Sequence, residues 1–170
     1  MRCTAAEAEV LVFTFKEGLL SGMAHDLKLK VHDFTIDFDN ETSAVRAEFA
    51  PESLRVVCAR RDGADEPEAL SVHDLREIDN HVSMEVLHPA RFSELRFEGC
   101  RLSPTHVRGS LTLHGQIHEL DVALSQSGEH WLAEAHLDQR IWGIRPYSAV
   151  MGALKVRPEI LVQVRVPLAR

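Results

Sequence analysis

Long uncharged apolar runs are missing from this sequence. A membrane-spanning helix needs about 18 consecutive apolar residues, and no such stretch occurs. The first nine residues, 1–9, carry two acidic side chains and lead directly into strand-like sequence, so they do not have the apolar stretch of a signal peptide. The sequence therefore predicts a cytoplasmic protein with no membrane insertion.

Cysteine is scarce and unpaired in sequence. The chain has three, Cys3, Cys58 and Cys100, and none of them forms a Cys-x-x-Cys pair. That pattern argues against a zinc site or a redox pair. We expect two buried thiols and one thiol near a loose terminus, because a free cysteine packs as a small apolar side chain.

Basic residues and catalytic motifs are also in short supply. Lys and Arg total 19 against 26 for Asp and Glu, which gives a formal charge of −7. This balance argues against nucleic acid or anionic lipid surfaces as main partners. Ser21 lacks the Gly-x-Ser-x-Gly context of a nucleophile elbow, and no glycine-rich phosphate loop occurs. The sequence therefore predicts a single domain over residues 1–170 that is not an enzyme.

Alternation of apolar and polar residues is the strongest pattern present. A period of two is typical of half-buried strands. The parity flips between Val31 and Phe34, which predicts a bulge or a sharp bend within one long strand. We expect eight or nine strands, nearly all in hairpin-connected order, with 27–38 as one long strand: 10–15, 27–38, 45–49, 54–56, 95–97, 107–113, 120–124, 131–137 and 160–166.

One segment, 70–87, has helical spacing instead. Its apolar residues are Leu75, Ile78, Val82 and Val86, and Ser71 with Asp74 resembles a capping box. His88-Pro89 should end the helix. We expect an all-β antiparallel barrel whose one α-helix covers a mouth, with the polar stretch 60–68 as an exposed loop.

The segment 139–156 is dense in glycine, proline and large apolar side chains, which surface loops normally avoid. We expect this loop to pack under itself with Trp142, Tyr147 and Met151. Such a loop could plug or line one end of a barrel, where small molecules bind.

Four stretches in order resemble the YceI-like family. They are 10–15, 75–97, 107–116 with its Gly-x-Leu-Thr-x-x-Gly pattern from Gly109 to Gly115, and 139–156. The start of the second strand, Gly22-Met23-Ala24-His25-Asp26-Leu27, is similar to a cytosolic subgroup. The resemblance implies a lipocalin-like barrel around an elongated apolar cavity that holds a polyisoprenoid chain.

A barrel of about eight strands can be filled by side chains or can hold one small ligand. Composition leaves both open, because large and small apolar residues are mixed. We expect the ligand-binding side chains to be apolar ones on strands and on the 139–156 loop: Phe13 or its neighbours, Phe34, Phe38, Phe49, Phe97, Trp131, Trp142, Tyr147 and Met151.

Polar groups at the rim would orient a head group. His25 beside Asp26 could be fixed in one tautomer by the carboxylate, and Arg140 could pair with a polar head. The ten histidines lack convergent metal spacing. We expect His114 and His118 to be solvent-exposed hairpin residues, with His32, His81, His106, His130 and His136 at outward or loop positions, and we assign no metal ligands.

The sequence thus predicts a binding or carrier protein for an extended apolar molecule, an isoprenoid or an isoprenoid quinone. We expect no cofactor other than such a bound lipid and no nucleic acid partner. Two alternatives remain at this stage. One is a metal-assisted enzyme at the rim using His25 and Asp26. The other is a filled barrel that acts as an interaction module, for instance as a homodimer.

Overall fold

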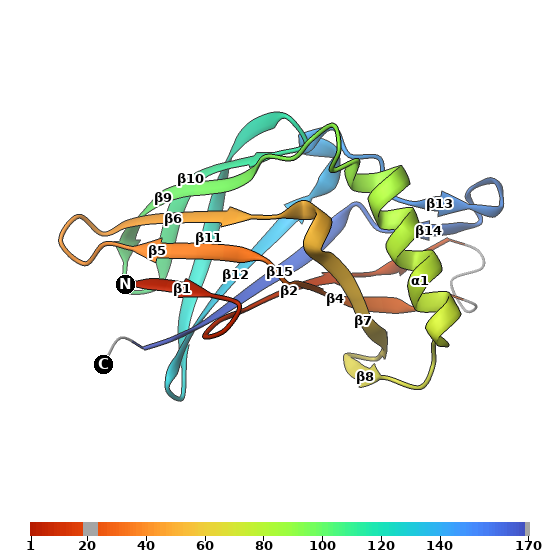
Figure 1. Cartoon of the computed structure of the whole chain (residues 1–170), viewed down its shortest axis with the longest axis horizontal. Coiled ribbons are helices and arrows are strands. Elements are labelled where there is room, and N and C mark those ends of the chain that lie inside the picture. The colour runs from red at the N-terminus through yellow and green to blue at the C-terminus, as the bar shows by residue number, and fades with distance from the viewer. Residues whose placement is uncertain (19–23, 169–170) are drawn as a thin grey trace.

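The computed structural model describes residues 1–18 and 24–168. It is almost entirely β-structure (Figure 1). The strands are β1 (Arg2–Thr4), β2 (Glu9–Thr14), β3 (Lys16–Glu17), β4 (Asp26–Val31), β5 (Phe34–Phe38), β6 (Ala44–Phe49), β7 (Leu54–Arg61), β8 (Ala64–Glu66), β9 (Leu95–Ser103), β10 (His106–Leu113), β11 (Gln116–Ser127), β12 (His130–Asp138), β13 (Ser148–Ala149), β14 (Leu154–Val156) and β15 (Glu159–Pro167).

The antiparallel pairings close into a barrel. The main sheet has the order β1-β5-β6-β9-β10-β11-β12-β15-β2-β4-β7-β8. β4 and β5 are the two halves of one bent strand: β4 pairs with β2 and β7, whereas β5 pairs with β1 and β6. When β4 and β5 are counted as one strand, the path runs from β15 through β2, β4–β5, β6, β9, β10, β11 and β12, and β12 pairs with β15 again. The prediction of a lipocalin-like, all-β barrel is confirmed.

The bend between β4 and β5 lies where the sequence parity flips. Leu29, Val31, Phe34 and Ile36 are all buried, so the inward face is kept on both sides of the bend. The Ser53 hydroxyl accepts hydrogen bonds from the backbone N–H groups of the two residues between the strands, His32 and Asp33, at 3.2 and 3.0 Å. The bend interrupts the strand pairing at these two residues, and the bonds to Ser53 satisfy their backbone donors.

The helix α1 (Val72–His81) begins as predicted. The Ser71 hydroxyl accepts from the Asp74 backbone N–H at 3.2 Å, and the Asp74 carboxylate accepts from the Ser71 backbone N–H at 2.8 Å. This capping box satisfies two N-terminal donors. The helix continues as a π-helical turn (Val82–Leu87), which the sequence did not predict, and ends at His88 with φ 48°. In Figure 1 the helix lies across the barrel at the end far from both termini.

Two expectations about the periphery were wrong. The polar stretch 60–68 is not a free loop, because β7 reaches Arg61 and β8 folds back on it as a hairpin. Cys3 is not loose, since β1 pairs with β5 and buries it, and the exposed thiol is Cys100 on β9. Burial raises the pKa of both Cys3 and Cys58, so these two thiols stay protonated at neutral pH.

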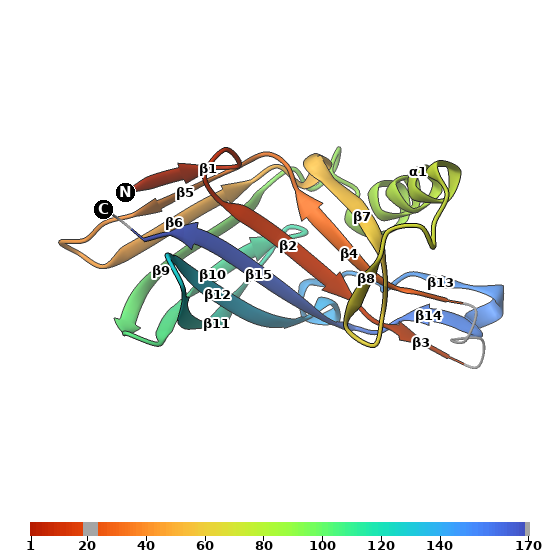
Figure 2. The same ribbon diagram turned by 90° about the horizontal axis from the view of Figure 1, so that it is seen from below.

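A second, small sheet extends one end of the molecule. It has the order β13-β14-β3 and includes much of the 139–156 segment. In Figures 1 and 2 it projects past the helix, away from the termini. Of the helices in the described part of the chain, none has the length and apolarity needed to cross a bilayer.

Candidate ligand-binding site

An apolar cavity of about 840 Å³ runs through the barrel. Alternation along the strands positions its walls, since every second residue faces inward. β12 contributes Trp131, Ala133, Ala135 and Leu137, and β15 contributes its four inward aliphatic residues, Ile160, Val162, Val164 and Val166. The volume lies within the range of about 300–1,000 Å³ that is usual for ligand pockets. The barrel is therefore hollow, which the sequence had left open.

Small residues explain why the barrel is not filled. Gly99 on β9 and Gly109 on β10 face each other across the ladder. A Cβ at Gly109 would lie 2.6 Å from the Phe97 ring and 2.4 Å from the Glu98 carbonyl oxygen. The Phe97 ring therefore rests over the two glycines, close to the wall, and leaves the centre open. This is a physical reason for the glycine that begins the Gly-x-Leu-Thr-x-x-Gly pattern.

The cavity extends between two ends of different character. At one end the Trp131 ring lines the space beneath the Arg101 guanidinium, whose central carbon lies 4.6 Å from the ring centroid. At the other end the helix contributes Ile78 and the π-helical turn contributes Val82 and Val86. The helix thus covers one mouth, as the helical spacing of its apolar residues predicted.

Polar groups gather at the helix-covered mouth. His25, Asp74, Glu77, His81 and Tyr147 all contribute to its lining. The rings of His81 and Tyr147 are 5.0 Å apart. Burial, followed by the nearby carboxylates of Glu85 and Glu77, raises the pKa of Tyr147. Its hydroxyl therefore remains a neutral donor at physiological pH, and it can orient a polar head group without adding charge.

Gln139 is a further polar residue of the cavity wall, and the sequence did not predict it. Only 7% of its surface is exposed, and it forms part of the cavity wall. Its side-chain amide donates to the Arg157 carbonyl oxygen at 3.3 Å. An amide has a second donor hydrogen and an acceptor oxygen, so Gln139 can offer a hydrogen bond to a polar atom of a ligand. The sequence signal for this residue was its position as a polar side chain close after the end of an apolar strand.

Several of the predicted residues do line the cavity. Those brought together are Phe38, Phe49, Phe97, Trp131, Tyr147 and His25. The four aromatic residues on strands have the inward parity expected from the sequence.

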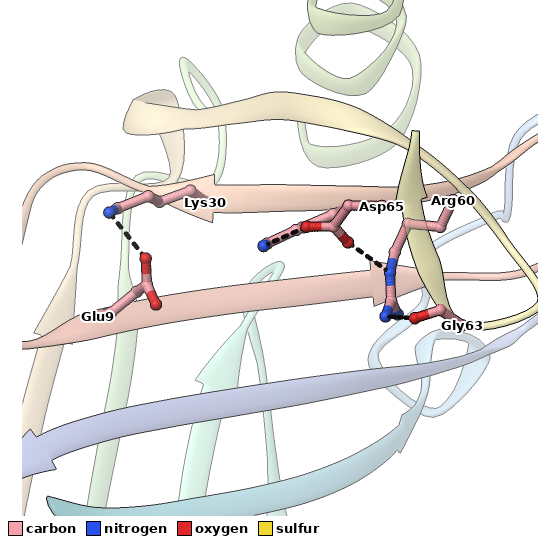
Figure 3. Close-up of polar contacts among 6 residues, drawn as sticks. Glu9, Lys30, Arg60, Gly63 and Asp65 are labelled. Carbon is pink, nitrogen blue, oxygen red and sulfur yellow. Dashed lines mark hydrogen bonds and ion pairs between the residues drawn. The ribbon is translucent and has the colours of Figure 1, made fainter. Parts of the chain in front are cut away.

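Phe13 lies outside the cavity. On β2 the inward residues are Val10, Val12 and Thr14, so Phe13 points outward. The Arg60 guanidinium covers its ring at 4.6 Å. Figure 3 shows how Arg60 is held there by Asp65 at 2.9 Å and by the Gly63 carbonyl oxygen. An outward phenylalanine is thus buried by the β7–β8 hairpin.

Three other residues of the predicted ligand-binding set also lie outside the cavity lining. Phe34 has inward parity, but its ring packs against Phe49, 6.2 Å away, and does not reach the cavity lining. Trp142 is buried, yet its indole N–H donates to the Leu111 carbonyl oxygen at 3.0 Å, on the side of the β10–β11 hairpin. Met151 is fully exposed at the tip between β13 and β14. The 139–156 segment does line the cavity, through residues such as Ile144 and Leu154.

Two predicted rim residues have structural roles. The Asp26 carboxylate accepts from the Lys16 backbone N–H at 2.8 Å, which ties the start of β4 to β3. Arg140 pairs with Asp138 at 2.6 Å, and the hydrogen bond from Arg140 lowers the pKa of Asp138. The Asp26 side chain thus stabilises local backbone and the Arg140 side chain pairs with a neighbouring carboxylate, and both lie outside the cavity lining.

The histidine expectations need correction at three positions. His114 occupies a two-residue turn with Gly115, at φ 52° and 74°, the left-handed geometry of a type I′ hairpin. Its ring packs 3.9 Å from that of Phe92, and its Nε2 is buried without a partner. His118 packs edge-on against Trp142 at 5.5 Å. His81 lines the cavity mouth.

Burial, reinforced by His88 and Arg91, lowers the pKa of His114. The unfolded chain therefore binds this proton more readily than the folded protein. The free energy of unfolding should have its full value above about pH 6.5 and should fall as the pH drops below that value. Asn tolerates the left-handed turn, so His114→Asn should remove this part of the acid sensitivity. Urea unfolding of both proteins from pH 7.5 to 5 measures it, and parallel curves would contradict this assignment.

Within residues 1–18 and 24–168, no group of three His, Cys, Asp or Glu side chains converges as a metal site.

A barrel with a long apolar interior and a covered mouth defines a small-molecule binding barrel. The YceI-like domain model matches residues 6–168, and the chain belongs to the YceI-like family.

Two solved structures have the same fold. One is the crystal structure of BcnA from Burkholderia cenocepacia, with a TM-score of 0.61 and 11% identity over 97% of this chain and 98% of that chain. The other is a polyisoprenoid binding domain from Saccharophagus degradans implicated in plant cell wall breakdown, with a TM-score of 0.57 and 8% identity over 98% of this chain and 97% of that chain. No curated protein matches the chain significantly.

Proposed function

We propose that this protein binds one extended apolar molecule, an isoprenoid or an isoprenoid quinone, and does not catalyse a reaction on it. The observation that carries the proposal is the cavity of about 840 Å³ with aliphatic and aromatic walls. The polyisoprenoid binding domain from Saccharophagus degradans has the same fold, which supports an isoprenoid over other apolar molecules.

Burial would supply the affinity. Transferring one methylene from water into an apolar site contributes about 0.8 kcal/mol, so a few isoprene units outweigh the cost of ordering the ligand. The tail would lie along the inward faces of β11, β12 and β15. A polar head would remain at the helix-covered mouth, where His25, His81 and Tyr147 provide hydrogen-bonding groups.

Native mass spectrometry of protein purified from cells, followed by solvent extraction, tests this proposal. We expect the folded protein to carry an additional lipid-sized mass in a ratio of one to one, and the extracted compound to contain an isoprenoid chain. A bound metal would favour a metal-assisted enzyme. A doubled mass without a ligand would favour an interaction module. Either result would contradict the proposed function.

A further inference from the structure

The tip of the β13–β14 hairpin exposes two apolar side chains. Val150 is 63% exposed and Met151 107% exposed, so most of Val150 and all of Met151 is in contact with solvent. Both have left-handed backbone conformations, with φ 51° and 55°. A β-branched residue rarely adopts that conformation. The hairpin therefore holds two apolar side chains in water at the expense of backbone strain.

The charge of the surrounding segment is opposite to that of the chain. Between Gln139 and Pro158 the sequence has four basic residues and no acidic one, although the whole chain carries −7. Asp138 neutralises Arg140. The other three, Arg145, Lys155 and Arg157, are exposed. A locally positive surface therefore lies next to the apolar tip, although the overall charge of the chain is negative.

The neighbouring acidic groups indicate which side of the mouth would face an anionic partner. Glu77 and Glu85 lie on the helical side near Tyr147. Their closest basic partners are His73 and His81, at 3.5 and 2.6 Å. Glu17 lies opposite Lys155 across the small sheet. The helical side is thus acidic. On the hairpin side Glu17 stands opposite Lys155 alone, and the exposed Arg145 and Arg157 still favour an anionic partner there.

The hairpin is also part of the cavity mouth. Tyr147, Leu154, Lys155 and Val156 line the cavity and flank the tip. Figures 1 and 2 both show this hairpin as the farthest projection at the end that the helix covers.

We propose that the Val150-Met151 tip, with Arg145 and Lys155, docks the cavity mouth on an anionic lipid bilayer so that the ligand can pass between membrane and barrel. This inference rests on the proposed function, because a long isoprenoid must be exchanged with a lipid phase. Lys155 pairs with Ser148, two residues before Val150, which places it about 7 Å behind the tip. A tip inserted to a depth of about 5–10 Å, as interfacial segments are, would hold Lys155 at the lipid phosphates.

Co-sedimentation with phosphatidylcholine vesicles containing phosphatidylglycerol tests the docking. The double variant Val150→Asn, Met151→Asn should bind these vesicles about tenfold more weakly, because the inserted apolar area is lost without any change of charge. Asparagine tolerates the left-handed conformation better than valine, so the variant should fold. The matched control is Leu102→Asn on β9, since Leu102 is 61% exposed at the other end of the cavity, near Arg101. It should bind as the wild type does.

Charge is tested separately. Arg145→Gln and Lys155→Gln should each weaken vesicle binding about fivefold, and pure phosphatidylcholine vesicles should bind the wild type poorly. Arg46→Gln on β6, which replaces another exposed basic residue, serves as the control and should have no effect.

The outcomes separate this inference from the proposed function, because affinity for geranylgeraniol is measured in parallel without vesicles. Tip variants should keep that affinity. If the wild type binds geranylgeraniol but not the anionic vesicles, or if the tip variant sediments like the wild type, docking is overturned alone. If the wild type binds vesicles through the tip but not geranylgeraniol, the proposed function fails. A dimer that the tip variant splits, without vesicle binding, would assign the tip to self-association and overturn docking.

Discussion

Trp142→Ala should lower the free energy of unfolding by about 3–5 kcal/mol and leave the affinity for geranylgeraniol nearly unchanged. Only 2% of the Trp142 surface is exposed, and its indole belongs to the main core cluster. Its removal opens a hole beside the β10–β11 hairpin. It also deprives the Leu111 carbonyl oxygen of its 3.0 Å hydrogen bond. Since Trp142 does not line the cavity, the ligand should lose no direct contact.

Urea unfolding and geranylgeraniol titration of the same variant measure both quantities. Trp131→Ala is the matched control, because the half-buried Trp131 ring lines the cavity. That variant should lose affinity and less stability than Trp142→Ala. A Trp142→Ala protein with normal stability and weakened binding would show that the 139–156 segment contacts the ligand through its tryptophan after all.

Ala133→Phe should abolish most ligand binding while leaving the fold intact. Ala133 faces the cavity from β12, and a phenyl ring there would occupy space that the tail needs. Displacing a few methylenes at about 0.8 kcal/mol each predicts a loss of affinity of about 100-fold. Because the ring would enter an existing void, overpacking should be small.

The matched control is Ala123→Phe on the adjacent strand β11. Ala123 pairs with Glu134, next to Ala133, but it is exposed on the outer face. It should bind geranylgeraniol as the wild type does. Equal binding by Ala133→Phe and Ala123→Phe, measured by titration, would mean that the ligand does not use this part of the cavity.

Local features of the fold could be predicted from the sequence because their causes are local. The parity flip between Val31 and Phe34 predicted the bend between β4 and β5. The Ser71 and Asp74 spacing predicted where α1 begins. The alternation along β12 and β15 predicted the cavity walls. In each case the backbone period alone decides the direction of a side chain.

Contacts made by distant segments could not be predicted in this way. Phe13 and Val12 are both apolar, and only the β7–β8 hairpin with Arg60 makes the outer face a suitable place for a phenylalanine. Trp142 follows a strand end in a segment that does line the cavity. Its direction depends on a partner 31 residues away, the Leu111 carbonyl. His114 was expected to be a solvent-exposed hairpin residue, but it occupies the turn itself, where strand parity does not decide the direction of a side chain.

The most direct test of a single extended chain in the cavity is a series of prenols of increasing length, titrated against the wild-type protein. The affinity should rise with each added isoprene unit, at about 0.8 kcal/mol per buried methylene before ordering costs. It should level off once the tail fills the cavity, with one ligand bound per protein throughout. Affinity that is independent of chain length, or binding of several ligands per protein, would contradict the account.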